Sequence, residues 1–180
     1  MAENHPSVLR VKAALRAAGH HDNVTALDDA ARTAKEAAAA LGIEVGQVAS
    51  SIVFGLESEG EATPLLVITS GQHKVDTQRV AEFLGVEKLL RADADFVRRW
   101  SGFAIGGVSP LGWDAEPATD TTITGHPADM VILVDTALDT FDEVWAAAGH
   151  PHTVFPTTFA ELVRMTQGTP CDVGVRSPSE

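Results

Sequence analysis

The chain has 180 residues, of which 44% are hydrophobic and 21% charged, a composition typical of a single globular domain rather than of a disordered chain. Its 13 Lys and Arg against 25 Asp and Glu give a formal net charge of -12, which argues against autonomous, tight binding of nucleic acid because phosphate contacts require a basic face. The single cysteine, Cys171, excludes an intrachain disulfide, and with no apolar run of transmembrane length and no N-terminal signal pattern in the sequence we expect a cytoplasmic protein.

Apolar residues recur with helical spacing in six segments. Ser7 can cap the first of them, and Thr33 with Glu36 and Thr158 with Glu161 have the spacing of a capping box. We therefore predict helices over residues 7–18, 33–41, 76–85, 93–100, 141–148 and 158–166.

Short runs of β-branched and aliphatic residues separate these helices, and they predict strands over residues 24–27, 47–56, 64–69, 86–90, 130–134 and 152–155. The second and third of these runs flank an acidic turn and indicate a hairpin. Most strands follow one another too closely for regular βαβ crossovers. We expect one domain over residues 1–168, an irregular excursion at 114–128, and a flexible tail over 169–180.

The most informative segment is a glycine-rich loop over residues 104–112, which reads Ala-Ile-Gly-Gly-Val-Ser-Pro-Leu-Gly. Gly106 and Gly107 allow a ligand to approach the main chain closely, while Pro110 restricts the loop. Backbone N–H groups in such a loop can bind an anion or a carbonyl oxygen. The loop has neither the Lys-Ser/Thr of a P-loop nor a G-x-G-x-x-G sequence, so a nucleotide-phosphate cradle is not expected.

Five segments in a fixed order resemble a known family. They are TAKEAAAALG at residues 33–42, QVASSIVF at 47–54, SGQHKVD at 70–76, the G-x-x-x-P pattern of GGVSP at 106–110, and residues 134–138 followed by VWAAAGHPH at 144–152. Together they are similar to the YbaK/EbsC family, the editing domains associated with prolyl-tRNA synthetase. The resemblance covers about residues 25–166.

This resemblance implies an α+β fold in which helices flank a curved, mixed, mostly antiparallel sheet, with a pocket between the sheet and the glycine loop. It implies an aminoacyl-tRNA deacylase that hydrolyses the ester of a mischarged tRNA as a free-standing trans-editing factor. No metal or other cofactor is expected. The implied partner is mischarged tRNA, bound weakly or with the help of a second protein, for which prolyl-tRNA synthetase is the candidate. Neither a membrane nor DNA is expected as a partner.

Four residues are candidates for a catalytic role: Ser50, Gly106, Gly107 and His150. The two glycine N–H groups can hold the amino end of the substrate or stabilise the oxyanion, and the sequence leaves this choice open. His150 can position the substrate or a water molecule, or it can be a turn histidine shaped by Pro151. A metal site at His150 and His152 lacks a third ligand.

Five further residues are candidates for substrate binding: Ser51, Lys74, Val108, Pro110 and Asp135. Val108, with Ile52 and Phe54, would set the size of the pocket. Asp135 can orient a group in the pocket or be a solvated carboxylate at a strand end. Trp113, beside the glycine loop, is the better candidate to stack on the terminal adenosine, whereas Trp145 is expected in the core.

The sequence departs from the family at Ser50, where many members have a lysine. Three interpretations follow. Ser50 can act as a neutral hydrogen-bond donor, Lys74 can reach into the pocket and replace the charge, or the protein has lost deacylase activity and retains a binding role. Two other functions therefore stay open: a non-catalytic module that recognises aminoacylated tRNA ends or a synthetase, and a hydrolase of small esters.

Overall fold

The computed structural model describes residues 2–176. Its α-helices are α1 (Pro6–Ala17), α2 (Ala34–Leu41), α3 (Thr77–Leu84), α4 (Ala94–Ser101) and α5 (Phe159–Thr166), and its 3-10 helices are η1 (Ala2–Asn4), η2 (Val45–Gln47) and η3 (Thr136–Thr140). Its strands are β1 (Thr25–Ala26), β2 (Val48–Ser58), β3 (Glu61–Ser70), β4 (His73–Val75), β5 (Leu90–Arg91), β6 (Val131–Asp135), β7 (Val144–Ala147), β8 (Thr153–Thr157), β9 (Thr169–Cys171) and β10 (Gly174–Arg176).

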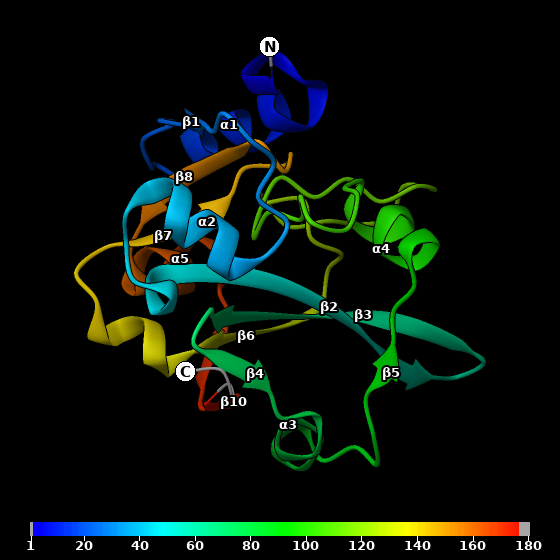
Figure 1. Ribbon diagram of the computed structural model, residues 1–180. Coiled ribbons are helices and arrows are strands. Elements are labelled where there is room, and N and C mark those ends of the chain that lie inside the picture. The colour runs from blue at the N-terminus through cyan, green and yellow to red at the C-terminus, as the bar shows by residue number, and fades with distance from the viewer. Residues whose placement is uncertain (1, 177–180) are drawn as a thin grey trace.

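Eight strands form one sheet in the order β1-β8-β7-β2-β3-β6-β9, with β5 paired to β2 beside this path. The pairs β1/β8, β7/β8, β2/β3 and β2/β5 are antiparallel, whereas β2/β7, β3/β6 and β6/β9 are parallel. In the view of Figure 1, α2 and α4 lie above the long β2–β3 hairpin and α3 lies below it. The predicted α+β class with a mixed, mostly antiparallel sheet is confirmed.

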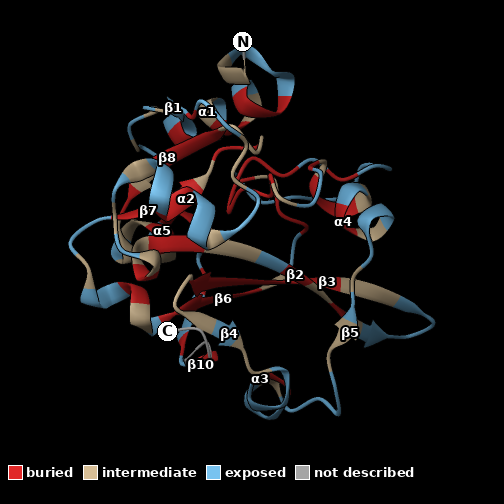
Figure 2. Ribbon diagram, viewed as in Figure 1, coloured by how far each residue is buried: buried red, intermediate tan, exposed pale blue. Residues whose placement is uncertain are grey.

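The β2–β3 hairpin is the centre of the fold. Its register runs from Ala49 opposite Ser70 to Ser58 opposite Glu61, and Gly60 in the turn has a φ of 82°. The apolar run over residues 65–68 of β3 is fully buried (Figure 2), because alternate residues belong to hydrophobic clusters on opposite faces of the sheet. A strand covered on both faces explains why this run is continuous rather than alternating.

Helix α2 is placed by the predicted capping box. The Thr33 hydroxyl accepts from the Glu36 N–H, the Glu36 carboxylate accepts from the Thr33 N–H, and Gly42 ends the helix in the left-handed region at φ 69°. The small buried face of α2 packs on Val48 at the start of β2. This contact holds the middle of α2 over the start of β2.

The helix predicted over residues 141–148 is wrong, because Val144–Ala147 is strand β7. It pairs with β8 on one side and with β2 on the other, where Val48 lies opposite Trp145. Val144 and Ala146 are buried while Trp145 and Ala147 are half-buried, which is the two-residue period of a strand. The favourable helix propensity of the alanines is overridden by pairing on both edges.

Three smaller expectations also need correction. The flexible tail predicted over residues 169–180 is wrong for 169–176, since β9 pairs with β6 and β10 pairs with β4; residues 177–180 lie outside the described part. The cap of α1 is His5 rather than Ser7, because the His5 ring accepts from the Ser7 N–H. The strand predicted at 86–90 is reduced to β5.

None of the helices in residues 2–176 combines the length and the apolarity that crossing a membrane requires.

Candidate functional site

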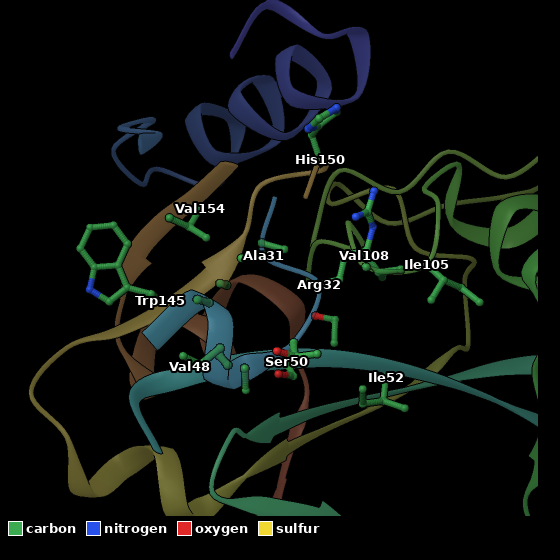
Figure 3. Close-up of a pocket in the computed structure, with 18 of the residues that line it drawn as sticks. Ala31, Arg32, Val48, Ser50, Ile52, Ile105, Val108, Trp145, His150 and Val154 are labelled. Carbon is green, nitrogen blue, oxygen red and sulfur yellow. The ribbon is translucent and has the colours of Figure 1, made fainter. Parts of the chain in front are cut away.

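A pocket of about 410 Å³ opens between the start of α2, the strands β2 and β7, and the glycine loop (Figure 3). Its wall is mainly apolar, and it includes Ala37 of α2, Ile52 of β2, Trp145 of β7 and Val108 of the loop. Cavities of this size and character are typical of sites for small organic groups.

The floor of the pocket is an interruption in the sheet. One edge of β2 pairs with β3 over its whole length, but the other edge pairs with β7 only at Val48 and Ala49 and with β5 only at Phe54 and Gly55. Residues 50–53 therefore have no strand partner on that edge within the described structure. We call this segment the open edge.

Main-chain groups of the open edge face the pocket. The C=O of Val48 accepts from the N–H of Gly71, which points it toward β3. Because the direction of the main-chain groups alternates along an antiparallel pair, Ser51 and Val53 present their N–H and C=O groups on the opposite side. A ligand in the pocket thus meets both donors and acceptors in a wall that is otherwise apolar.

The glycine loop faces this edge and contains a tight turn. The Gly107 N–H donates to the Ala104 C=O at 3.0 Å, and Gly106 has a φ of 94°, at the third position of the turn, where glycine is favoured. Within the described residues, no acceptor is found for the N–H of Gly106 or Val108. Because both residues line the pocket, these two N–H groups are candidates to bind an oxyanion or a carbonyl.

Ser51 carries an unsatisfied buried hydroxyl. Among the described residues, three buried side-chain atoms have no hydrogen-bond partner, namely Ser51 Oγ, Arg99 Nη1 and His126 Nε2. Of these residues, only Ser51 lines the pocket. An unsatisfied hydroxyl costs stability, so its presence in a cavity wall favours a ligand that hydrogen-bonds it.

His150 lies at the mouth of the pocket, directly beside the glycine loop: a Cβ on Gly107 would lie 3.1 Å from the His150 Cα. The His150 Nδ1 accepts from the N–H of His152 at 3.1 Å. Burial, and then the positive charges of His5, His152 and Arg32, lower the pKa of His150. The neutral ring therefore carries its proton on Nε2, and in this state His150 is a hydrogen-bond donor rather than a base.

The structure brings five of the nine predicted site residues together in the pocket, whereas Gly107, Pro110, Lys74 and Asp135 lie outside its lining. Ser50, Ser51, Gly106, Val108 and His150 line the pocket. Gly107 packs against His150 instead, and its N–H donates to the Ala104 C=O and is not available to a substrate. Pro110 is buried within the loop and Lys74 is exposed on β4, and neither lines the pocket. The described residues contain no group of three or more His, Cys, Asp or Glu side chains arranged to hold a metal ion.

Asp135 is neither solvated nor in the pocket. Its carboxylate is fully buried and accepts from the Thr69 hydroxyl at 3.2 Å, the Ser70 N–H at 2.9 Å and the Ala137 N–H at 3.0 Å. His73 Nδ1 lies 2.8 Å from the same carboxylate. We call these five residues the Asp135 cluster, and its hydrogen bonds tie the end of β3 to the start of η3.

The two tryptophan expectations are reversed. Trp113 is only 3% exposed, its indole N–H donates to the Ser109 C=O at 2.8 Å, and its ring packs against His126. It is therefore not free to stack on a ligand. Trp145, expected in the core, lines the pocket from β7.

Arg32 was not anticipated from the sequence. It lines the pocket, and a Cβ on Gly106 would lie 3.1 Å from its Cγ. Its position immediately before the capping box is the signal that could have indicated it, since the residue before the N-cap is held in place by the cap.

Comparison with known proteins gives a consistent result. A family model described as the aminoacyl-tRNA editing domain matches residues 28–165, a range that contains the whole lining of the pocket. A solved structure of a candidate trans-editing enzyme for prolyl-tRNA synthetase is 36% identical, with a TM-score of 0.77, and the match covers 94% of this chain and 98% of that one.

Two curated relatives extend this result. A proline–tRNA ligase of Limosilactobacillus fermentum is 37% identical over 83 residues, which are 46% of this chain, and the chain matches only 14% of the length of that ligase. The Bacillus subtilis protein YwhH is 23% identical over 141 residues, covering 78% of this chain and 79% of YwhH.

Proposed function

The chain belongs to the aminoacyl-tRNA editing domain family, and we propose that it acts in trans as a hydrolase that removes a wrongly attached amino acid from tRNA. Mischarged tRNA is the proposed substrate and prolyl-tRNA synthetase the proposed partner. The similarity over nearly full length to a candidate trans-editing enzyme supports action as a separate protein rather than as part of a ligase.

The observation that carries this proposal is that one pocket combines apolar space with unpaired main-chain donors and acceptors. An apolar cavity of about 410 Å³ is bounded by unpaired main-chain groups on two sides, the open edge and the glycine loop. An aminoacyl ester needs these elements: apolar space for its side chain, acceptors for its α-ammonium group and donors for its carbonyl oxygen.

We infer the following arrangement of the substrate. The amino acid side chain occupies the apolar part of the cavity, and the C=O groups of Ser51 and Val53 accept from the α-ammonium group. The N–H groups of Gly106 and Val108 donate to the ester carbonyl oxygen, where negative charge develops as the carbonyl carbon is attacked. Binding by main-chain groups makes this part of the site independent of side-chain identity.

Hydrolysis then requires only a positioned water molecule. Its oxygen forms a bond to the carbonyl carbon, the bond from that carbon to the ribose oxygen breaks, and a proton from the water passes to the ribose oxygen. The hydroxyl of Ser50 is the proposed donor that replaces the family lysine and orients the ester. His150, neutral and protonated on Nε2, donates to the substrate at the mouth of the pocket and does not act as the base.

Deacylation of a panel of alanyl-, cysteinyl- and seryl-tRNA(Pro), with and without prolyl-tRNA synthetase, tests the proposal. Gly106→Val should lower kcat/KM about 100-fold or more, because it forces a side chain into a residue at φ 94° and against Arg32. Gly60→Val is the matched control, since Gly60 has a φ of 82° in the hairpin turn and a Cβ at this position would have no atom within 4 Å. Equal losses in both variants would contradict the assignment of the loop.

The departure at Ser50 favours a second candidate, a module that binds aminoacylated tRNA ends without cleaving them. The decisive variant is Ser50→Lys, which restores the residue that many family members have at this position. An inert wild type together with an active Ser50→Lys variant would establish the binding module. An active wild type would show that the serine is sufficient.

A further inference from the structure

Four nitrogen-bearing side chains gather at the mouth of the pocket: His5, Arg32, His150 and His152. We call them the rim cluster. The ring centroids of His5 and His150 are 5.1 Å apart, and those of His150 and His152 are 5.4 Å apart. Arg32 and His150 both line the pocket, and Figure 3 shows both at its mouth. His5 precedes α1 and lies outside the range that the family model matches, so the cluster joins the editing domain to the N-terminal helix.

Main-chain hydrogen bonds fix where the imidazole protons lie. His5 Nδ1 accepts from the Ser7 N–H and His150 Nδ1 accepts from the His152 N–H, each at 3.1 Å. Each neutral ring must therefore carry its hydrogen on Nε2. His152 differs, because its Nδ1 lies 3.2 Å from the Leu27 C=O and must donate to it. Two of the three rings thus present an N–H donor without needing to be protonated.

Positive charge at the rim is not neutralised by the protein. None of the ion pairs found among residues 2–176 includes Arg32. The charges that lower the pKa of His150 come from His5, His152 and Arg32. The Glu36 carboxylate accepts from the main-chain N–H of Arg32 at 3.3 Å and forms no ion pair with its guanidinium. In a chain of formal net charge -12, a site with an unpaired positive charge is unusual, and it favours the binding of an anion.

We propose that the rim cluster binds a phosphate group of the tRNA 3′ end, namely the one attached to the 5′ oxygen of the terminal nucleotide. Arg32 contributes the charge, and the Nε2–H groups of His5 and His150 donate to the phosphate oxygens. The proposal rests on the proposed function: with the aminoacyl group in the cavity, the terminal ribose lies at the mouth and its phosphate is the next charged group along the chain. This local contact also reconciles substrate binding with an acidic protein.

The first test measures binding and needs no catalysis. AMP carries the phosphate in question and adenosine lacks it, so wild type should bind AMP about tenfold more tightly than adenosine in calorimetric titrations. Arg32→Gln should remove most of this difference. His5→Asn should reduce it about fivefold while keeping a residue type that caps α1 well. Equal affinities for AMP and adenosine in wild type, or no binding of either, would overturn the proposal, and inorganic phosphate binding as tightly as AMP would show a site for free anions instead.

The second test compares a tRNA substrate with an aminoacyl ester of adenosine, which has the same ester and ribose but no phosphate. Arg32→Gln should lower kcat/KM at least fivefold more for the tRNA than for the adenosine ester. The slope of log(kcat/KM) against log[KCl] with tRNA should become shallower by about 0.7, as expected for one lost phosphate contact. The matched control is Lys88→Gln, which removes one exposed positive charge between α3 and β5, away from the pocket, and should change neither quantity.

The two tests separate the failure of this inference from that of the proposed function. A wild type that hydrolyses neither ester contradicts the deacylase, whereas the AMP titration still decides the rim cluster. A wild type that hydrolyses both esters, with Arg32→Gln affecting them equally or not at all, contradicts the rim cluster alone.

Discussion

The Asp135 cluster and the pocket both contain serine and histidine, and they differ in how completely their hydrogen bonds are satisfied. In the Asp135 cluster, a buried carboxylate accepts from Thr69, Ser70 and Ala137 and pairs with His73. In the pocket, the Ser51 hydroxyl and the N–H groups of Gly106 and Val108 have no protein partner within the described structure. Serine, histidine and aspartate are therefore informative about function only when their bonding is known: the satisfied cluster supports the fold, and the unsatisfied one can bind a ligand.

Replacing the buried carboxylate should have the largest effect and should fall on stability. Asp135→Ala leaves the Ser70 and Ala137 N–H groups and the Thr69 hydroxyl without an acceptor, and we expect the free energy of unfolding to fall by about 3–5 kcal/mol. Denaturant unfolding measures this loss. The kcat/KM of the folded fraction should stay within about twofold of the wild-type value. A loss of activity without a loss of stability would instead show that Asp135 acts in substrate binding or catalysis.

Acid should lower the stability of the protein through a buried histidine, His126. Burial lowers the pKa of His126 to about 4 from 6.5, so between these values the unfolded chain binds a proton that the native protein does not. The free energy of unfolding should be insensitive to this group above pH 6.5 and fall by about 3 kcal/mol as the pH drops to 4. Urea titrations across this range, with His126→Gln as the variant that lacks the effect, measure it. An unchanged pH slope in the variant would show that His126 is protonated in the native state.

Removing the Ser51 hydroxyl should have the smallest effect on stability, and it should raise stability while lowering activity. Ser51→Ala removes an unsatisfied buried hydroxyl, so the free energy of unfolding should rise by about 1 kcal/mol. The same change should lower kcat/KM about tenfold, since we expect a ligand in the pocket to hydrogen-bond this unsatisfied hydroxyl. Ser58→Ala, an exposed position on the same strand, is the control and should alter neither value. A destabilised Ser51→Ala variant would show that the hydroxyl is bonded after all and that the comparison fails at this residue.

The elements that the sequence predicted well are those with local signals. The capping box at Thr33 and Glu36 fixed the start of α2, and the acidic turn between two apolar runs located the β2–β3 hairpin. The order of motifs also indicated the family correctly, since the editing-domain model matches residues 28–165. Such signals depend on neighbours within a few residues and can be read without the fold.

What the sequence could not predict depends on contacts between distant segments. Whether Asp135 is solvated or buried is decided by β3 and η3, and the strand at 144–147 exists because β2 and β8 lie on both sides of it. His5 and His150 lie close together in the fold but far apart in the chain. The sequence near either residue does not predict this contact. The roles proposed for Ser50, Gly106 and His150 stay predictions until the variants are measured.

The interruption of the sheet at residues 50–53 has a consequence for solubility. Unpaired strand edges invite pairing with other chains and are a recognised cause of aggregation. Here the unpaired run is short and lies in a cavity with α2 and the glycine loop as walls, so we expect a small acyl group to reach it more readily than a foreign strand. The walls of the pocket therefore also hinder pairing of the open edge with other copies of this chain. A variant that loosens α2 would be expected to self-associate before it unfolds.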